Sequence, residues 1–422
     1  MDDLDKIFKA YDIRGIYPKE INEKIAHKIG KISDGVLVVA RDNRPPSNKL
    51  SRAVIKGANS AGTDVIDIGL VTTPIFYFAV NKFKADGGII VTASHNSEKY
   101  NGFKIVGKNA VPVGNIGLNK IKKCIEINYN SGDIKHKGKT TKKEIFDDYI
   151  KKILGLSHAN KIKQFKIAIN TKNKTAKLVV SRIIKNLGKI KLVDLPSKAD
   201  FGITFDGDGD RIFFTDENNK KIDPDLISAI LIHYCFKKAG TILYTVASSR
   251  IIKNEAINNG SEIACSRVGH SFIKEIMARK KIDFGCEASG HYYFKDTGYY
   301  EEPILVFIKL MEILSAVKMP LSKLVKSFDK LYRERIEIKI NNINKVNLQI
   351  RKIENKYKKI SRSGRLPNIL HIDGLNVEYP DWWFNLRVSN TEPILRLTIE
   401  ADTKQLLVEQ REKLLKSIPS LF

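Results

Sequence analysis

Short apolar runs alternate with amphipathic stretches along the first three quarters of the chain, and one phrase recurs. It reads SRAVIK once and SRIIK twice, at 51–56, 181–185 and 249–253. An apolar run precedes each copy, at 36–40, 167–169 and 242–247. A glycine and a further apolar stretch follow each copy. Because strand, loop, helix, glycine and strand in this order are typical of a βαβ unit, the pattern predicts three α/β repeats.

The three repeats also end alike, in a short apolar strand that runs into a polar, glycine-containing loop. The sequences are GGIIVTASHN, FGITFDGDGDR and FGCEASGH, at 87–96, 201–211 and 284–291. In open α/β sheets, ligands bind at the carboxyl ends of the strands. We therefore expect the three loops to face one cleft.

The pattern changes after about residue 336. Strands are predicted at 336–340 and 395–401, and helices at 346–360 and 403–417. The expected fold class is therefore α/β, with three similar α/β repeat domains followed by a smaller C-terminal α+β domain. The expected domain limits are 1–138, 139–236, 237–335 and 336–422.

The composition narrows the class of protein. The chain has 422 residues, of which 42% are hydrophobic and 28% charged, a balance typical of soluble globular proteins. Its four cysteines form no C-x-x-C pair, so we expect no zinc ribbon and no disulfide framework, and a cytoplasmic location. The acidic N-terminus lacks the apolar core of a signal peptide. The most apolar stretch, 303–317, carries Lys309 and Glu312, so we expect an amphipathic helix and no membrane association.

The net charge of +26 has two interpretations. The lysines could be spread over the surfaces of all domains as a bias of composition, or the protein could bind a polyanion. Residues 135–198 hold 18 lysines and arginines against four acidic residues. This block contains only three aromatic residues and no nucleic-acid-binding motif, so we do not expect nucleic acid to be the primary partner.

The loop DGDGDR carries the clearest chemical pattern. Asp206, Asp208 and Asp210 alternate with glycines directly after a strand, so three carboxylates can turn onto one hard cation. A solvated acidic turn is one alternative. An EF-hand is another, because Glu217 would stand at its twelfth position, but the required glycine is replaced by Arg211 and the preceding segment is a strand. The pattern favours Mg²⁺, which suits a carboxylate site that also holds a phosphate.

Three other loops carry polar groups whose functions the residues alone leave open. Ser94 beside His95 could be a nucleophile or could lie in an ordinary turn. The carboxylate, hydroxyl and imidazole in EASGH could bracket vicinal sugar hydroxyls or could line a polar loop. RVSNT, at 387–391, offers a guanidinium with short hydrogen-bond donors, as a phosphate cradle requires. Arg396 could add a second charge there or only decorate a strand.

Taken in order, these motifs resemble those of the α-D-phosphohexomutase family, the phosphomannomutases and phosphoglucomutases. The matching segments span almost the whole chain: FKAYDIRG, TASHN, NGFK, DGDGDR, EASGH and RVSNTEP, at 8–15, 92–96, 101–104, 206–211, 287–291 and 387–393. The resemblance implies four domains, with mixed sheets in the repeats, around a central cleft.

The resemblance also implies the reaction. Ser94 would be phosphorylated at rest, with one Mg²⁺ per chain between its phosphate and Asp206, Asp208 and Asp210. Hexose 1-phosphate and hexose 6-phosphate would interconvert through hexose 1,6-bisphosphate, which also serves as activator. The partners would be phosphosugars, with the protein a monomer or homodimer. A phosphoglucosamine mutase, and a non-catalytic relative that binds sugar phosphates or polyanions, are the alternatives.

The resemblance assigns further roles to individual residues. Ser94, His95, Lys104 and Arg14 would be catalytic, and we favour Lys104 for acid–base catalysis, with a pKa lowered by a cationic site. The substrate-binding residues would be Tyr11, Arg211, His270, Glu287, Ser289, His291, Arg387, Ser389, Asn390 and Thr391. The last four would hold the phosphate that is not reacting.

Three departures from the family pattern stand out. Ser97 replaces the proline that usually follows TASHN, and the segment 247–249 lacks a lysine that some members carry. The third is a shortened second repeat, where the chain passes almost directly from the helix at 181–187 to the strand at 201–205. Stability, oligomeric state or a partner surface could differ as a result.

Overall fold

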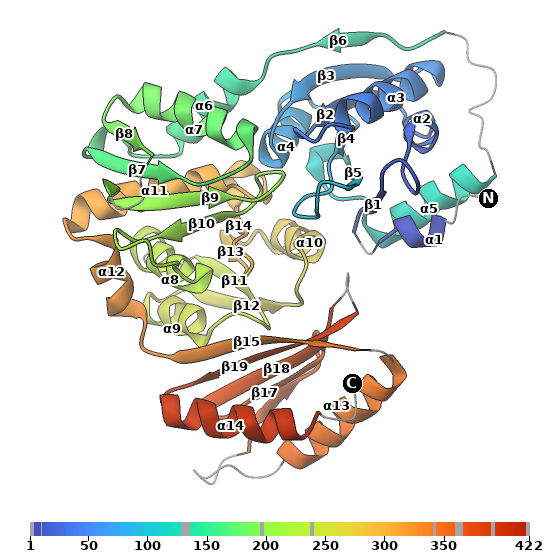
Figure 1. The fold of residues 1–422 in the computed structure, drawn as a ribbon. Coiled ribbons are helices and arrows are strands. Elements are labelled where there is room, and N and C mark those ends of the chain that lie inside the picture. The colour runs from blue at the N-terminus through green and yellow to red at the C-terminus, as the bar shows by residue number, and fades with distance from the viewer. Residues whose placement is uncertain are drawn as a thin grey trace.

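The computed structural model describes residues 4–9, 11–127, 136–194, 198–236, 240–340, 343–358, 366–389 and 393–418. They form four sheets, each with its own helices (Figure 1). The first unit is blue to teal, the second green, the third yellow-green to orange and the C-terminal unit orange to red. No helix in the described ranges is both long and apolar enough to cross a bilayer.

The first three sheets share one topology, which confirms the predicted repeats. In each, a first strand pairs in parallel with a second and a third, and the third pairs antiparallel with a fourth. In the first sheet, the strands from first to fourth are β2 (Val36–Arg41), β3 (Asp64–Leu70), β4 (Gly87–Val91) and β5 (Tyr100–Gly107). In the second sheet they are β7 (Phe165–Ile169), β8 (Ile190–Val193), β9 (Phe201–Phe205) and β10 (Ile212–Thr215). In the third sheet they are β11 (Thr241–Thr245), β12 (Glu262–Ser266), β13 (Phe284–Cys286) and β14 (Tyr292–Phe294). The sheets are therefore mixed.

Helices connect the parallel strands. The first unit contains α1 (Leu4–Ile7), α2 (Glu23–Lys31), α3 (Ser47–Ser60), α4 (Thr73–Lys82) and α5 (Gly114–Glu126), with two more strands, β1 (Ile13–Ile16) and β6 (Thr140–Lys142), at the edges of its sheet. The second contains α6 (Phe146–Gly155) and α7 (Lys174–Leu187), and the third α8 (Pro224–Cys235), α9 (Arg250–Asn258), α10 (His270–Lys280), α11 (Pro303–Val317) and α12 (Leu321–Phe328). Among the described residues, the second repeat has no α-helix between β8 and β9, where the others have α4 and α10.

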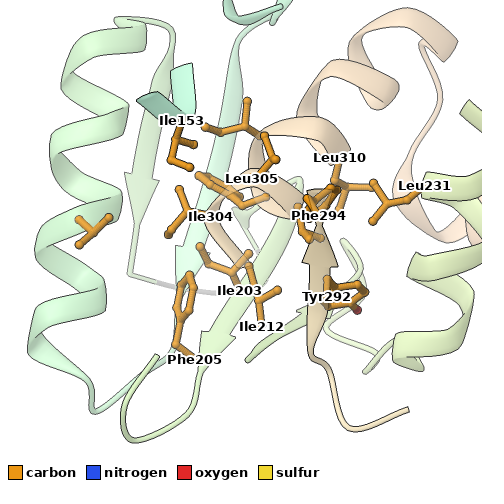
Figure 2. Packing of buried hydrophobic residues seen from close by; sticks show 14 of the residues in the cluster. Ile153, Ile203, Phe205, Ile212, Leu231, Tyr292, Phe294, Ile304, Leu305 and Leu310 are labelled. Atoms are coloured by element: carbon orange, nitrogen blue, oxygen red, sulfur yellow. The ribbon is translucent and has the colours of Figure 1, made fainter. Parts of the chain in front are cut away.

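One hydrophobic core joins the three α/β units, and α11 lies near its centre. Figure 2 shows Ile304, Leu305 and Leu310 of this helix between residues of the second sheet, such as Ile203, and residues of the third, such as Phe294. The expected helix is present, but its exposed side is narrow: eleven of its fifteen residues are buried, and Lys309, Glu312, Ala316 and Val317 are the other four. A helix that contacts two sheets can bury almost its whole surface, and its two charges lie on the narrow side that stays partly exposed.

The C-terminal unit has a separate core. Its strands run antiparallel throughout and lie in the order β15 (Tyr332–Lys339), β19 (Ile394–Ala401), β18 (Trp382–Val388), β17 (Leu375–Glu378) and β16 (Asn368–Leu370). Helices α13 (Ile343–Tyr357) and α14 (Lys404–Lys416) cover one face, the lower one in Figure 1. Apolar side chains such as Leu386, Ile399 and Leu414 form a cluster distinct from that of the α/β units. This arrangement confirms the expected smaller α+β domain.

Polar contacts connect the C-terminal unit to the third. Glu400 is fully buried and accepts hydrogen bonds from Trp383 Nε1 and the Arg250 amide, both at 2.9 Å. Arg333 donates to Asp223 at 3.0 Å, and Arg335 to Asp225 at 2.6 Å. The three α/β units thus share an apolar core, whereas charged groups hold the fourth unit against them.

Candidate active site

Ser94 follows the end of β4 in a conformation that few side chains adopt. Its φ is +51°, in the left-handed region that is costly for residues with a Cβ atom. The backbone amide donates to Thr92 Oγ1 at 2.9 Å, and the side chain is 2% exposed. The hydroxyl oxygen lies 3.4 Å from His95 Nδ1. A strained backbone held by tertiary contacts is a recurring feature of functional sites.

Arg44, which the sequence did not single out, holds this loop in place. Its guanidinium donates to the carbonyl oxygens of Ser94 and Asn96 at 2.7 Å each, of Ser97 at 2.8 Å and of Tyr100 at 3.1 Å. The fifth N–H group bonds Asp42 at 3.0 Å. All five donors of the side chain are therefore used, four of them on the loop that carries Ser94.

The aspartate loop packs directly against the serine loop. A Cβ atom added to Gly207 would lie 2.2 Å from the Ser94 carbonyl oxygen, so only glycine permits this approach. Asp206, Asp208 and Asp210 each offer an oxygen, and these atoms lie within 4.8 Å of one another. One buried oxygen of each carboxylate has no hydrogen-bond partner. Three carboxylates whose oxygens lie this close together, with spare acceptor capacity, fit a hard divalent cation such as Mg²⁺.

Lys104 enters this cluster from β5. Its ammonium nitrogen lies 2.6 Å from both Asp208 Oδ2 and Asp210 Oδ2. Burial disfavours the charged form of Lys104, but the two carboxylates more than offset it and hold the pKa of Lys104 well above its ordinary value. The lowered pKa expected from the sequence is therefore wrong, because the groups next to Lys104 are carboxylates. Thr73 Oγ1 donates to the same Asp208 oxygen at 2.8 Å.

Two arginines border the serine loop. Arg14, on β1, donates to Asn96 Oδ1 at 2.6 Å and pairs with Asp12. Arg211 Nη2 lies 3.1 Å from His95 Nδ1. Partial burial and the positive charges of Arg211 and Arg14 lower the pKa of His95 to about 4. The structure thus brings together the four residues predicted to be catalytic, with a neutral imidazole at neutral pH.

The third loop meets the aspartates through His291. Its Nε2 lies 3.2 Å from Arg211 Nε and 3.4 Å from Asp210 Oδ1. Its Nδ1 lies 2.8 Å from Ser289 Oγ and 3.2 Å from Glu287 Oε2. Burial and Arg211 lower the pKa of His291, but Asp210 and Glu287 raise it more, to about 9. The Glu287 carboxylate also accepts from the Gly269 amide at 3.2 Å and from Tyr293 Oη at 2.7 Å.

Tyr11 and His270 lie beside this loop. Their rings meet edge to face, with centroids 5.7 Å apart. The hydroxyl oxygen of Tyr11 is buried and has no hydrogen-bond partner among the described residues. Burial raises the pKa of Tyr11 to about 12, so the phenol is neutral. An unpaired neutral hydroxyl is free to bond a ligand.

The fourth loop faces the third across a pocket of about 200 Å³. Arg387 and Arg396 line it from the C-terminal unit, and Glu287, Ala288 and Ser289 line it from the third. Arg396 pairs with Glu337 at 3.1 Å. Ser389 is buried at the end of β18, whereas Asn390 and Thr391 lie outside the described residues. The pocket places a guanidinium opposite the predicted sugar-recognition loop.

Family models match most of the chain. They are described as the α/β/α domain I of phosphoglucomutase/phosphomannomutase, at residues 5–131, domain III, at 223–332, and the C-terminal domain, at 317–417. A phosphomannomutase of Escherichia coli is 33% identical and matches over 94% of this chain and 95% of its own. A phosphomannomutase of Methanocaldococcus jannaschii is 31% identical, with 98% of both chains covered.

Solved structures share the fold. A phosphoglucomutase/phosphomannomutase family protein from Burkholderia thailandensis superposes with a TM-score of 0.85 at 26% identity, over 98% of this chain and 97% of that one. A phosphoglucomutase from Paramecium, in an open form, superposes with a TM-score of 0.77 at 15% identity, over 97% of this chain and 94% of that one. At that identity the likeness concerns the fold alone.

Proposed function

Because the chain belongs to the phosphoglucomutase/phosphomannomutase family of sugar-phosphate mutases, we propose that Ser94 carries the phosphoryl group between carbons 1 and 6 of a hexose. One observation supports this most strongly: the strained Ser94 lies directly against the loop that presents three clustered carboxylates. A nucleophile next to a cation site is the arrangement that phosphoryl transfer requires.

In the proposed cycle, phosphorylated Ser94 reacts with the 6-hydroxyl of a hexose 1-phosphate. The P–O bond to Ser94 Oγ breaks while a P–O bond to the sugar oxygen forms, and the hydroxyl proton passes to a base. The hexose 1,6-bisphosphate then turns over in the cleft. Ser94 Oγ takes the phosphoryl group from carbon 1, whose oxygen regains a proton, and hexose 6-phosphate leaves.

Charge neutralisation would come from several sides. Asp206, Asp208 and Asp210 would hold Mg²⁺, which supplies positive charge at the transferring phosphoryl group. Lys104 would remain protonated and, with Arg14, would stabilise the negative oxygens by hydrogen bonds. Because Lys104 is held as a cation, we assign the base to His95, whose Nδ1 lies 3.4 Å from Ser94 Oγ.

The remaining residues would bind the two ends of the substrate. Glu287, Ser289, His291, Tyr11 and Arg211 border the side of the cleft that we assign to the sugar. The distal phosphate would lie against Arg387, with Ser389, Asn390 and Thr391. Because the bisphosphate must reverse its direction, this second site must accept either phosphate and should recognise the phosphate itself.

Four domains with the limits 1–138, 139–236, 237–335 and 336–422 would surround this cleft. We place the enzyme in the cytoplasm, as a monomer or homodimer. Its four cysteines are free, as a reducing compartment favours: Cys124, Cys235, Cys265 and Cys286.

Substrate choice can be tested directly. Mannose 1-phosphate, glucose 1-phosphate and glucosamine 1-phosphate would be offered with Mg²⁺ and catalytic glucose 1,6-bisphosphate to the wild type, Ser94→Ala and the control Ser97→Ala. We expect turnover of the first two, as the family description and the names of the relatives suggest, and its loss only in Ser94→Ala. Turnover of the glucosamine compound alone would indicate a phosphoglucosamine mutase. A phosphorylated, folded protein that converts none of them would contradict the proposal.

A further inference from the structure

A buried ion pair lies behind the site and has no part in the proposed mechanism. Lys274, on α10, and Glu301, just before α11, have side chains that are 5% and 0% exposed. Lys274 Nζ lies 2.6 Å from Glu301 Oε2. The same ammonium lies 3.9 Å from the centre of the Tyr77 ring on α4. The pair therefore lies where the third α/β unit meets the first.

A buried pair of this kind needs a reason, because desolvating two charges costs as much as their attraction returns. A second cation site is one possible reason, since Asp210, His291 and Glu301 offer ligand atoms within 4.8 Å of one another. However, the ammonium groups of Lys274 and Lys104 already lie 2.6 Å from Glu301 and Asp210. Glu301 thus has its own counter-charge, and Asp210 already belongs to the aspartate cluster that we propose for Mg²⁺, so we assign no second cation to this group.

The other oxygen of Glu301 points to a different role. Glu301 Oε1 lies 3.5 Å from His270 Nδ1, and both atoms are buried without a hydrogen-bond partner among the described residues, so each is the nearest polar group that the other can use. Burial and the positive charges of Lys274 and Lys104 lower the pKa of His270 well below its ordinary value. His270 is therefore a neutral imidazole, which carries one N–H group. A carboxylate can only accept, so the proton belongs on the nitrogen that faces it.

We propose that Glu301, held by Lys274, is a positioning residue that fixes His270 with its proton on Nδ1, so that Nε2 accepts a hydrogen bond from a sugar hydroxyl. The imidazole is 15% exposed at the start of α10 and lies edge to face with Tyr11. An acceptor repels phosphate oxygens and binds hydroxyl groups. His270 would thus recognise the sugar and contribute to the choice between hexoses. This inference rests on the proposed mutase function.

Substrate analogues test the recognition step. Hexose 1-phosphates that lack one hydroxyl, at carbon 2, 3 or 4, would be assayed with the wild type and His270→Phe. We expect one analogue to lose about tenfold or more in kcat/KM with the wild type, and this penalty to fall below about threefold in the variant. Glu301→Gln should reduce the same penalty, because it no longer fixes the tautomer. The neighbouring Glu302→Gln is the matched control and should keep it.

Nitrogen NMR tests the tautomer without any substrate. In protein labelled with ¹⁵N-histidine, the signals absent from His270→Phe identify the residue among eight histidines. We expect a protonated Nδ1 and a bare Nε2 in the wild type and in Glu301→Asp, and a mixed population in Lys274→Met/Glu301→Leu. The double variant removes both charges together, so it should fold even where a single change does not.

The outcomes separate this inference from the proposed function. A wild type that turns over hexose phosphates but shows a protonated Nε2, or an unchanged analogue penalty in His270→Phe, would overturn the inference alone. Absence of turnover in the phosphorylated wild type would overturn the proposed function, and the NMR experiment would still decide the tautomer.

Discussion

Contacts that a single guanidinium makes with a backbone loop determine where Ser94 lies. Arg44 bonds four carbonyl oxygens of the segment 94–100, and Asp42 holds the remaining N–H group. The loop departs from the family pattern at Ser97, whose carbonyl is one of the four. In this chain, hydrogen bonds from Arg44 therefore order the loop, which lacks the usual proline.

Replacement of Arg44 by lysine should reduce turnover. An ammonium group has three donors and cannot span four carbonyl oxygens, so at least two hydrogen bonds are lost. We expect kcat to fall about tenfold or more, with a smaller change in KM. Steady-state kinetics of Arg44→Lys, beside Arg52→Lys on the exposed face of α3, would measure it. An unchanged kcat in a folded variant would show that Arg44 does not position the loop.

The aspartates should determine metal affinity. Asp208→Asn removes one charge from the three carboxylates and weakens the anchor of Lys104. We expect the Kd for Mg²⁺, measured by calorimetry, to rise about tenfold or more. Asp216→Asn is the matched control, because that buried carboxylate bonds the backbone of a turn. Equal Mg²⁺ affinity in Asp208→Asn would place the cation elsewhere.

At the scale of residues, the sequence predicted those site residues that lie in short, recognisable motifs. Ser94 and the three aspartates follow strand ends in short, distinctive loops. Arg44, Lys274 and Glu301 were missed, because their partners lie far away in the chain and only the fold brings them together. The pKa of Lys104 was misjudged for the same reason: its neighbours come from another repeat.

At the scale of elements, the recurring phrase predicted strands and helices because each repeat uses the same periodicity. The burial of α11 could not be read from its charges. Glu302, the N-cap residue of α11, shows how strongly burial changes the properties of a single side chain. The side chain is fully buried and accepts from Tyr149 Oη on α6 at 2.5 Å. Burial raises the pKa of Glu302 from 4.5 to about 8.

The stability of the α/β body should therefore depend on pH through Glu302. Between pH 4.5 and 8 the folded chain keeps a proton here that the unfolded chain releases. The contribution of this group to the free energy of unfolding thus falls as pH rises, by at most about 1.4 kcal/mol per pH unit. Glu302→Gln does not titrate, so its urea-unfolding free energy should decline less between pH 5.5 and 7.5. Parallel curves for the two proteins would contradict the shifted pKa.

At the scale of the whole molecule, the main feature is that the C-terminal unit has a hydrophobic core separate from the one that the other three units share. The three α/β units share one apolar cluster, whereas the C-terminal unit has its own and meets the others through buried charges. Four units were predictable from the sequence because they repeat or change in pattern. Their interface was not, because Glu400 and Arg250 carry no signature in the chain. Binding of a polyanion by the basic block at 135–198 stays a prediction.

The C-terminal unit should lose stability independently. Both tryptophans, Trp382 and Trp383, lie on β18, so their fluorescence reports this unit. Arg250→Ala removes bonds to Pro380 O at 2.9 Å and Asp402 at 2.7 Å and leaves Glu400 with one cation fewer. We expect the fluorescence midpoint of thermal unfolding to fall by about 4 °C or more, with little change in the main circular-dichroism transition. Arg411→Ala, which breaks a surface pair within the unit, should have little effect.

The central claim is that Ser94 carries the phosphoryl group, and its transfer can be followed directly. The protein would be incubated with glucose 1,6-bisphosphate labelled in both phosphates, desalted, and mapped by tandem mass spectrometry. It would then be chased with unlabelled hexose 1-phosphate and Mg²⁺. The account predicts about one label per chain, on Ser94, that moves to the sugar in the chase and is absent from Ser94→Ala. A label on another residue, or an active enzyme that never carries one, would contradict it.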